Sequence, residues 1–229
     1  MLENPKQVAG RCAADLVESG MTLGLGTGST VFFVLERLAE RIREEGLEVR
    51  GVPTSLDTEG KARSMGIPLV TLDEVESLDL TIDGADEIDG DFNMVKGGGG
   101  ALLREKVIAS ISKREVIVAG PEKAVERLGT TFLLPVEVVP FARTVVARAL
   151  QALDCQPALR VDANGTAYLT DNGNEILDCR FPDGIANAAE CEREVLAIPG
   201  VVECGLFIGL AQVLVLGHPD GRAEVRELS

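Results

Sequence analysis

Residues 83–106 hold the side chains of this sequence that are best suited to acid–base chemistry. An apolar run typical of a buried strand leads into them. Acids then crowd together: Asp83, Asp86, Glu87, Asp89 and Asp91. Lys96 follows, then a run of glycines, and Glu105 stands beyond the glycines. Because carboxylates can move protons and a lysine beside backbone N–H groups can hold a negatively charged oxygen, the stretch indicates a small polar active site.

The glycine run comprises Gly97, Gly98, Gly99 and Gly100. It precedes a predicted helix over residues 101–111, so its N–H groups stand at a helix N-terminus, where anions bind. Four adjacent glycines cost much entropy on folding, and they let a ligand approach the backbone. The adjoining loop favours an oxyanion contact for Lys96 over a plain surface lysine. For Glu105, position alone favours an exposed helix residue paired with a neighbouring base.

A second glycine loop spans residues 24–30, between a predicted strand over 21–25 and a predicted helix over 31–42. Its polar end comprises Thr27, Gly28, Ser29 and Thr30. Strand, loop and helix N-terminus together form a phosphate cradle, and Ser29 or Thr30 can cap the helix. A third loop follows a predicted strand over 115–119 and brings Lys123 to the start of a short helix. A phosphate contact and a solvated lysine are equally good interpretations there.

The loop at residues 24–30 does not match a nucleotide motif. Ser29 stands at the third glycine position of the dinucleotide fingerprint, and no acid closes the next predicted strand, over residues 47–52. The lysine of a P-loop is also missing. These departures disfavour nicotinamide and nucleoside triphosphates. The hydroxyl groups favour a phosphate or sugar ligand over a plain strand-to-helix turn.

The acidic cluster does not have the spacing of a calcium loop. Counted from Asp83 or from Asp89, the glycine and glutamate positions of such a loop hold other residues. A magnesium site on two carboxylates stays open as an alternative, whereas Asp89 and Asp91 fit a solvated acidic loop. The cysteines are scattered without a C-x-x-C pair, and the only histidine is His218. We therefore expect no metal site, and reduced thiols in a cytoplasmic protein.

The order of predicted elements indicates an α/β fold in two domains. Over residues 1–130, strands and helices alternate, which is typical of a parallel sheet with helices on both faces. Ligands bind such sheets beyond the carboxyl ends of the strands, where the three loops would converge. Over residues 131–206, strand, helix, hairpin, helix and strand indicate a smaller α+β domain with an antiparallel sheet. A last strand over 212–216 returns to the first sheet, so residues 207–229 are assigned to the first domain.

Three further strands are predicted from short apolar runs. One covers residues 67–70, one covers 132–140 and is broken by Pro135, and one covers 201–207 without a break. The segment from Asp171 to Asn174 is expected to close a hairpin.

Acidic residues outnumber basic ones, which gives a formal net charge of −15 and a pI of about 4.5. Such a charge disfavours nucleic acid and anionic membranes as partners. No apolar run reaches the roughly 18 residues of a membrane span, and the first residues do not resemble a signal peptide. A negatively charged substrate therefore needs a local positive site, which adds weight to the lysines beside glycine loops.

Along nearly the whole chain, and in order, these motifs resemble those of the ribose-5-phosphate isomerase family, type A. The matching segments are Gly26-Thr-Gly-Ser-Thr30, Asp83-Gly-Ala-Asp86-Glu-Ile, Lys96-Gly-Gly-Gly99, Leu103-Arg-Glu-Lys106, Pro135-Val-Glu-Val, Thr170-Asp-Asn-Gly-Asn174 and Ile198-Pro-Gly-Val-Val202. The resemblance implies a Rossmann-like domain with an α+β lid, assembled as a homodimer or homotetramer. It also implies interconversion of D-ribose 5-phosphate and D-ribulose 5-phosphate, in the non-oxidative pentose phosphate pathway, without metal or organic cofactor.

By motif position, the resemblance implies that Glu105 is the general base. It also implies substrate-binding segments, which comprise Thr27, Gly28, Ser29, Thr30, Asp83, Gly84, Ala85, Asp86, Lys96, Gly97, Gly98, Gly99 and Lys123. Gly100 is a small departure, because alanine can follow the third glycine in the family. In the resulting hypothesis, Lys96 and the loop N–H groups hold the oxyanion of an enediolate. Asp83 or Asp86 handles hydroxyl protons.

Two other classes of protein stay open at this point. A non-catalytic sugar-phosphate sensor would keep the glycine loops without needing Glu105, Asp83 and Lys96 together. Such sensors tend to carry a DNA-binding module, and the sequence shows neither a helix-turn-helix segment nor a basic patch. A coenzyme-A transferase would use a glutamate nucleophile and form a covalent thioester, but this chain is short for that class.

Overall fold

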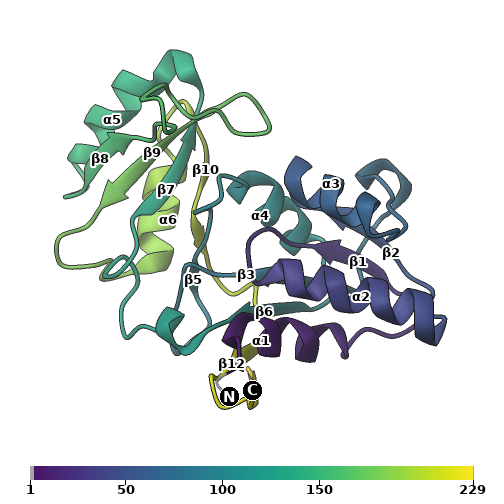
Figure 1. The fold of residues 1–229 in the computed structure, drawn as a ribbon. Helices are drawn as coiled ribbons and strands as arrows, with labels where there is room; N and C mark the ends of the chain where they lie inside the picture. The colour runs from purple at the N-terminus through teal and green to yellow at the C-terminus, as the bar shows by residue number, and fades with distance from the viewer. Residues whose placement is uncertain (1–2, 229) are drawn as a thin grey trace. The chain divides into compact units, whose positions relative to one another are not determined.

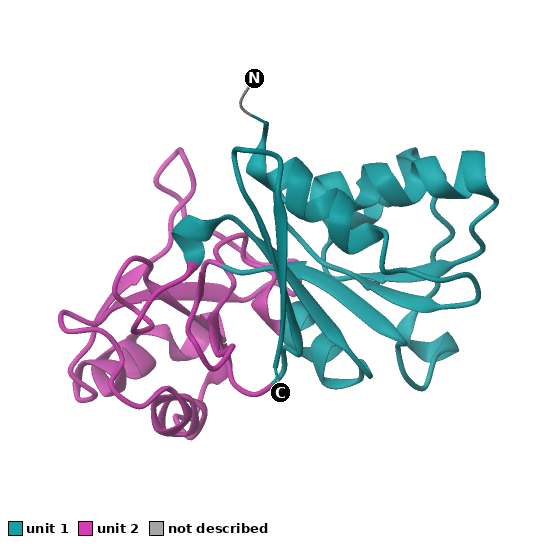
Figure 2. Cartoon of the chain, turned by 90° about the horizontal axis from the view of Figure 1, so that it is seen from below, with its two compact units in different colours: residues 1–85, 104–123, 210–229 teal, residues 86–103, 124–209 magenta. Residues whose placement is uncertain are grey.

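The computed structural model describes residues 3–228, which divide into two compact units (Figure 2). Unit 1 comprises residues 1–85, 104–123 and 210–229, and unit 2 comprises 86–103 and 124–209. The bounds expected from the sequence differ, because residues 86–103, 124–130 and 207–209 belong to unit 2. Residues 86–103 contribute two short strands that pair with each other, and the second of them also pairs with residues 206–207. The local sequence does not reveal that long-range pairing.

Unit 1 is built on a six-stranded sheet within the described residues. In spatial order its strands are β13 (Ala223–Glu227), β12 (Val213–Gly217), β6 (Glu115–Ala119), β3 (Leu80–Gly84), β1 (Thr22–Leu25) and β2 (Arg50–Pro53). All neighbours are parallel except β13, which pairs antiparallel with β12. The predicted parallel sheet and the return of the last apolar strand are thus confirmed. Strand order reverses between β1 and β3, the place where sheets of this class bind ligands.

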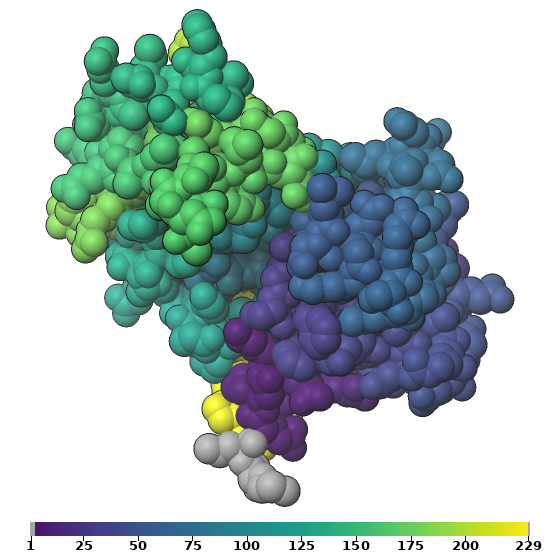
Figure 3. All heavy atoms as spheres, turned by 45° about the horizontal axis from the view of Figure 1, so that its top comes forward, coloured from purple at the N-terminus to yellow at the C-terminus, as the bar shows by residue number. Residues whose placement is uncertain are grey.

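Helices cover both faces of this sheet (Figure 1). The helices in or entering unit 1 are α1 (Pro5–Ala14), α2 (Val31–Glu45), α3 (Leu56–Ser64) and α4 (Leu102–Ser110), with short 3₁₀ segments at Leu72–Glu74 and Pro121–Lys123. Leu23 and Leu25 of β1 point to one face and pack with α1 and α2. On the other face, a side chain at Gly24 would collide with Thr81 and with Ile108 of α4, so α4 lies close to β1. The space-filling view shows α3 beside α2 (Figure 3).

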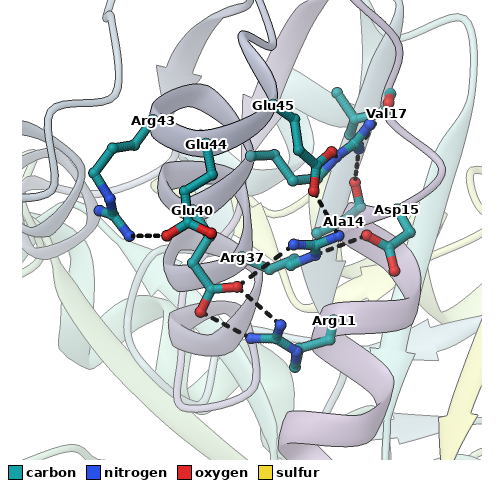
Figure 4. A network of polar contacts seen from close by, with 10 residues as sticks. Arg11, Ala14, Asp15, Val17, Arg37, Glu40, Arg43, Glu44 and Glu45 are labelled. Carbon is teal, nitrogen blue, oxygen red and sulfur yellow. Dashed lines mark hydrogen bonds and ion pairs between the residues drawn. The ribbon is translucent and has the colours of Figure 1, made fainter.

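The contact between α1 and α2 is reinforced by a network of ion pairs (Figure 4). Arg11 and Glu40 form a two-point pair at 2.8 and 3.0 Å, and Arg37 bonds Asp15 at 2.8 Å. Hydrogen bonding to Arg11 holds the pKa of Glu40 below its ordinary value. Because these charges are largely solvated, each pair contributes little to stability, about 0–1 kcal/mol. Arg41 adds two bonds to backbone carbonyls at the end of α1.

Unit 2 contains two antiparallel sheets among the described residues. The larger has the order β10 (Val201–Cys204), β7 (Leu134–Val138), β9 (Glu175–Arg180) and β8 (Gln156–Leu159). The smaller joins β11 (Leu206–Phe207), β5 (Met94–Val95) and β4 (Glu87–Ile88). Helices α5 (Arg143–Gln151) and α6 (Ala188–Leu196) belong to the same unit, together with a 3₁₀ segment at Pro140–Ala142. The core lies on one face of the larger sheet, where Val136, Val138 and Leu177 are buried. The predicted α+β arrangement is confirmed.

Several predicted strands need correction. Pro135 does not break β7. Its carbonyl faces β10 and accepts from the N–H of Gly205, just beyond the end of that strand. Because the ladder with β10 has already ended there, the N–H that proline lacks removes no ladder bond. The strand expected over 201–207 divides at Gly205 between two sheets. The segment over 67–70 makes only an isolated bridge. The hairpin turn at 171–174 is confirmed, since Thr170 and Asn174 bond across it.

No helix within residues 3–228 is both long and apolar enough to cross a bilayer.

Candidate active site

The loop after β1 is fixed by the first acid of the sequence motif. Asp83, at the end of β3, is fully buried, and its Oδ1 accepts from the N–H groups of Thr27 (2.9 Å) and Gly84 (2.7 Å). A Cβ at Gly26 would lie 2.2 Å from that same oxygen, so only glycine fits there. The carboxylate therefore joins the ends of β1 and β3 at the point where the strand order reverses.

Four hydroxyl groups gather beneath this loop. Thr27 Oγ1 lies 2.7 Å from Thr54 Oγ1, 2.8 Å from Ser55 Oγ and 3.3 Å from Thr58 Oγ1. Thr58 Oγ1 in turn donates to the carbonyl oxygen of Gly26 at 2.7 Å. Sequence reasoning singled out Thr27 alone. The other three hydroxyl groups belong to the polar segment that follows β2. That segment is the available signal for them, although the nucleotide-binding motif draws attention only to an acid at the end of the strand.

The start of α2 presents backbone N–H groups and a lysine. Thr30 stands at the N-cap, but its helical backbone angles leave its side chain without a capping bond, so the expected cap is wrong. Ser29 does not cap α2 either; its Oγ accepts from Lys6 Nζ at 2.8 Å. Within residues 3–228, no acceptor bonds the N–H groups of Ser29 or Thr30. Lys6, which sequence reasoning missed, adds positive charge to this loop from the first turn of α1.

The second acid of the motif holds the second glycine loop. Asp86 is half-buried, and its Oδ2 accepts from Gly98 N–H at 2.7 Å. Gly97 and Gly100 have positive φ angles of 96° and 81°, which favour glycine. A Cβ at Gly98 would lie 2.7 Å from Asp86 Oδ1, so a side chain there would displace the carboxylate that holds the loop.

Two residues of unit 2 that the sequence did not suggest contact the carbonyl oxygens of this loop. Arg160 Nη1 donates to the carbonyls of Gly97 and Gly98, both at 3.1 Å. Tyr168 Oη donates to the carbonyl of Gly99 at 3.2 Å. Burial raises the pKa of Tyr168 above its ordinary value, which keeps its hydroxyl protonated as a donor.

Lys96 is a buried lysine, with only 2% of its surface exposed. Its Nζ lies 5.2 Å from the centroid of the Phe207 ring, a cation–π distance, and its backbone N–H donates to Gly205 O at 2.9 Å. The backbone carbonyl of Lys96 also lies so close to Gly205 that a side chain there would collide with it. The burial rules out the plain surface lysine and holds the ammonium group in one place.

Glu105 is buried too, with 5% of its surface exposed, and it lies in the first turn of α4. The exposed position that its place in the sequence favoured is therefore wrong, because α4 turns this side chain away from solvent. Lys123 is half-buried and ends the 3₁₀ segment after β6. Gly84 and Ala85, which follow Asp83 at the end of the first segment of unit 1, are half-buried. Gly28 is exposed.

Among the described residues, no group of three or more histidine, cysteine, aspartate and glutamate side chains is arranged to hold a metal ion. The five cysteines are free thiols, and burial raises the pKa of Cys191 to about 11.

A Rossmann-like parallel sheet joined to an antiparallel α+β unit defines the fold class. Residues 50–221 match the family model described as ribose 5-phosphate isomerase A (phosphoriboisomerase A). Ribose-5-phosphate isomerase A of Bacillus mycoides is 47% identical over 221 residues, covering 96% of this chain and 99% of the relative. The protein of that name from Synechococcus sp. is 50% identical over 224 residues, covering 97% and 96%.

Solved structures agree with these relatives. Ribose 5-phosphate isomerase A from Methanocaldococcus jannaschii superposes with a TM-score of 0.91 at 39% identity, covering 97% of each chain. A D-ribose-5-phosphate isomerase in complex with phospho-erythronic acid gives a TM-score of 0.94 at 33% identity, covering 98% of this chain and all of the other. The chain belongs to the ribose 5-phosphate isomerase A family.

Proposed function

We propose that Glu105 is the base in the reaction that this chain catalyses, the interconversion of D-ribose 5-phosphate and D-ribulose 5-phosphate through an enediolate. The observation that carries this assignment is its place: a buried carboxylate in the first turn of α4, directly after the glycine loop. Aldose–ketose isomerisation needs one base that removes the proton from C2 and returns it to C1. Side chains tilt toward the helix N-terminus, so a residue in the first turn is directed toward the loop.

Lys96 and the N–H groups of the glycine loop are proposed to stabilise the oxyanion of the enediolate. Charge that develops in the transition state is best met by donors already fixed in direction. The burial of Lys96 and the bonds that fix the loop carbonyls support this role, since both limit reorganisation during the reaction.

Asp83 and Asp86 are proposed to handle hydroxyl protons, including those of ring opening. Asp86 is half-buried, and one of its oxygens, Oδ1, takes no part in the bond to Gly98 N–H. Asp83 has a further task, because its Oδ1 holds the turn between β1 and the first loop. Each acid thus has two roles: it takes part in the proposed substrate chemistry and it holds one glycine loop. Asp83 holds the loop after β1, and Asp86 holds the loop before α4.

The phosphate of the substrate is proposed to bind at the start of α2. Ser29 and Thr30 offer hydroxyl and N–H groups at a helix N-terminus, and Lys6 Nζ lies 2.8 Å from Ser29 Oγ. Thr27 and Gly28 complete this loop. Lys123 is a second candidate cation for the same phosphate. In a protein with a net charge of −15, such a local cluster of donors is what a dianion requires.

A homo-oligomer, a dimer in the simplest case, is proposed from the surface of unit 2. The apolar run at 213–216 does not contribute to it, because in β12 this run is buried between β6 and β13. Unit 2 instead exposes Phe141 almost completely (98%) and Val145 by 64%, four residues apart. Neighbouring exposed apolar side chains commonly mark a protein interface. Light scattering that found only monomers at micromolar concentration would contradict the proposal.

We further propose that the enzyme works in the cytoplasm, in the non-oxidative pentose phosphate pathway, without metal or organic cofactor. The test is a direct assay with ribose 5-phosphate, run before and after exhaustive chelation. The expected result is an unchanged rate. A loss that magnesium or manganese restored would move Asp83 and Asp86 to ligand roles. Complete inactivity on sugar phosphates would favour a sensor, and a covalent thioester formed with an acyl-coenzyme A would favour a transferase.

A further inference from the structure

Arg160 connects β9 of unit 2 with the glycine loop of the same unit. It follows β8 directly, and its own N–H and carbonyl bond Ile176 O and Tyr168 N–H, both at 2.9 Å, so its backbone is fixed. Its guanidinium forms a two-point pair with Asp178 of β9, Nε to Oδ2 at 2.9 Å and Nη2 to Oδ1 at 2.5 Å. Only 13% of the side chain is exposed. This geometry uses the planar fork of arginine, which a lysine cannot reproduce.

The remaining nitrogen, Nη1, bonds the carbonyls of Gly97 and Gly98. A trans peptide is planar, so each carbonyl points opposite to the N–H of the next residue. Holding the Gly97 carbonyl therefore turns Gly98 N–H away from Arg160, where it donates to Asp86. Holding the Gly98 carbonyl likewise turns Gly99 N–H away from Arg160.

Tyr168 extends the same arrangement by one residue. Its hydroxyl holds the carbonyl of Gly99, which sets the direction of Gly100 N–H, and that group donates to Gly97 O at 2.9 Å. Of the three N–H groups directed in this way, those of Gly98 and Gly100 have acceptors inside the loop region. Within residues 3–228, no acceptor bonds Gly99 N–H. It is the donor that the loop keeps available.

We propose that Arg160, braced by Asp178, is a positioning residue that fixes Gly99 N–H as a donor to the developing oxyanion, with Tyr168 in a supporting role. The inference rests on the proposed function of the loop. Four consecutive glycines have little conformational preference of their own, so without these bonds the donor would not be fixed in advance. Arg160 acts through the backbone and touches neither the substrate nor the reacting atoms.

The test compares Arg160→Met, which keeps length but removes every donor, with Arg143→Met as a matched control. Arg143 also pairs with a carboxylate of β9, Glu175, at 3.0 Å, yet it makes no bond to the glycine loop. We expect Arg160→Met to lower kcat about 10- to 100-fold, below the loss of a whole oxyanion donor, with KM within about threefold. Arg143→Met should change either constant by no more than about twofold.

A second readout reports the loop itself. In protein labelled with ¹⁵N-glycine, the amide signals of Gly98 and Gly99 should shift or broaden in Arg160→Met and stay in place in Arg143→Met. Tyr168→Phe removes a single hydroxyl; it should move the Gly100 signal and lower kcat only a few-fold. If Arg160→Met fails to fold, Arg160→Lys and Tyr168→Phe decide by the same two readouts.

The inference is overturned if Arg160→Met folds and keeps kcat within twofold, or if Arg143→Met loses as much. It is equally overturned if kcat falls while the glycine amide signals stay unchanged. Failure of the proposed function gives a different result. Glu105→Gln would then retain exchange of the substrate C2 proton with solvent, whatever the Arg160 variants do.

Discussion

The two glycine loops of this protein are fixed by opposite kinds of bond. In the loop after β1, a carboxylate accepts from backbone N–H groups, those of Thr27 and Gly84. In the loop before α4, side-chain donors hold three successive carbonyl oxygens, and one carboxylate takes a single N–H. The first arrangement leaves donors at the helix end, which suits a permanent dianion. The second leaves one directed donor, which suits a charge that appears only during reaction.

The largest effect should come from the helix behind the second loop. Glu105→Gln keeps size and polarity but cannot take a proton, so we expect a folded protein with near-normal substrate binding. Its kcat should fall by roughly 10²–10⁴, the usual contribution of a general base. Exchange of the C2 proton with solvent, followed by NMR, should be lost in parallel. Activity within a few-fold of wild type would move the base to Asp83 or Asp86.

The first loop should fail by steric conflict rather than by chemistry. Gly26→Ala adds a Cβ that would lie 2.2 Å from Asp83 Oδ1. This distance is far too short for two atoms that are not bonded, so the carboxylate or the turn must move. We expect a loss of about 1–3 kcal/mol in the free energy of unfolding, with reduced activity. The measurement is urea unfolding of the purified variant.

Gly60→Ala provides the matched control. Gly60 lies in α3, and a Cβ there meets no atom within 4 Å. This change should stabilise the protein by about 0.5–1 kcal/mol. If the two variants behaved alike, the close packing of Asp83 against Gly26 would not limit the loop.

A smaller effect is expected for the cations of the phosphate site. Lys6→Ala removes the ammonium beside Ser29, and Lys123→Ala removes the second candidate. Because a remote phosphate is held in ground state and transition state alike, each variant should mainly raise KM, by about tenfold, with kcat little changed. Lys61→Ala, on the exposed side of α3, is the control and should change neither constant. A collapse of kcat at fixed KM would instead assign the lysine to the chemistry.

The smallest expected effect concerns the start of β1, which leads into the first loop. Lys113 at 2.8 Å and the N–H of Thr22 hold the pKa of Asp79 below its ordinary value. The folded protein therefore takes up this proton at lower pH than the unfolded chain, whose aspartates titrate near pH 3.9. The stabilisation is present above that pH and is lost as pH falls through the folded value. Between pH 5 and pH 3, unfolding experiments should show a shallower loss of stability for Asp79→Asn; equal slopes would contradict this account.

How much the sequence could predict differs between the two loops. Strand, glycines and helix follow one another at residues 22–45, so local pattern sufficed to predict the first loop and its helix. The second loop was also visible as four glycines, but what fixes it was not. Arg160 and Tyr168 lie about 60 to 70 residues further on in an unremarkable segment, and only the pairing of β8 with β9 gives Arg160 its partner.

The same limit explains other errors. Burial of Glu105 depends on how α4 packs against the sheet. Its neighbours in the sequence, Arg104 and Lys106, are both charged, so the local pattern indicates an exposed position instead. Lys6 was overlooked because nothing in the first helix marks it as close to Ser29. The splitting of residues 201–207 between two sheets follows from Gly205, where the backbone of Lys96 passes too close for any side chain. Local periodicity carries no information on such approaches.

The antiparallel strand β13 covers what would otherwise be an apolar edge of the sheet. It closes the sheet beside β12, whose five residues are all buried and mostly large and aliphatic. Arg226 and Glu227 of β13 are exposed, and Arg226 Nε lies 2.8 Å from the half-buried Glu224. Charged edge strands resist pairing with a second chain. A chain that stopped before Ala223 would expose the backbone of β12 as a new apolar edge, and it should therefore self-associate into precipitates during expression.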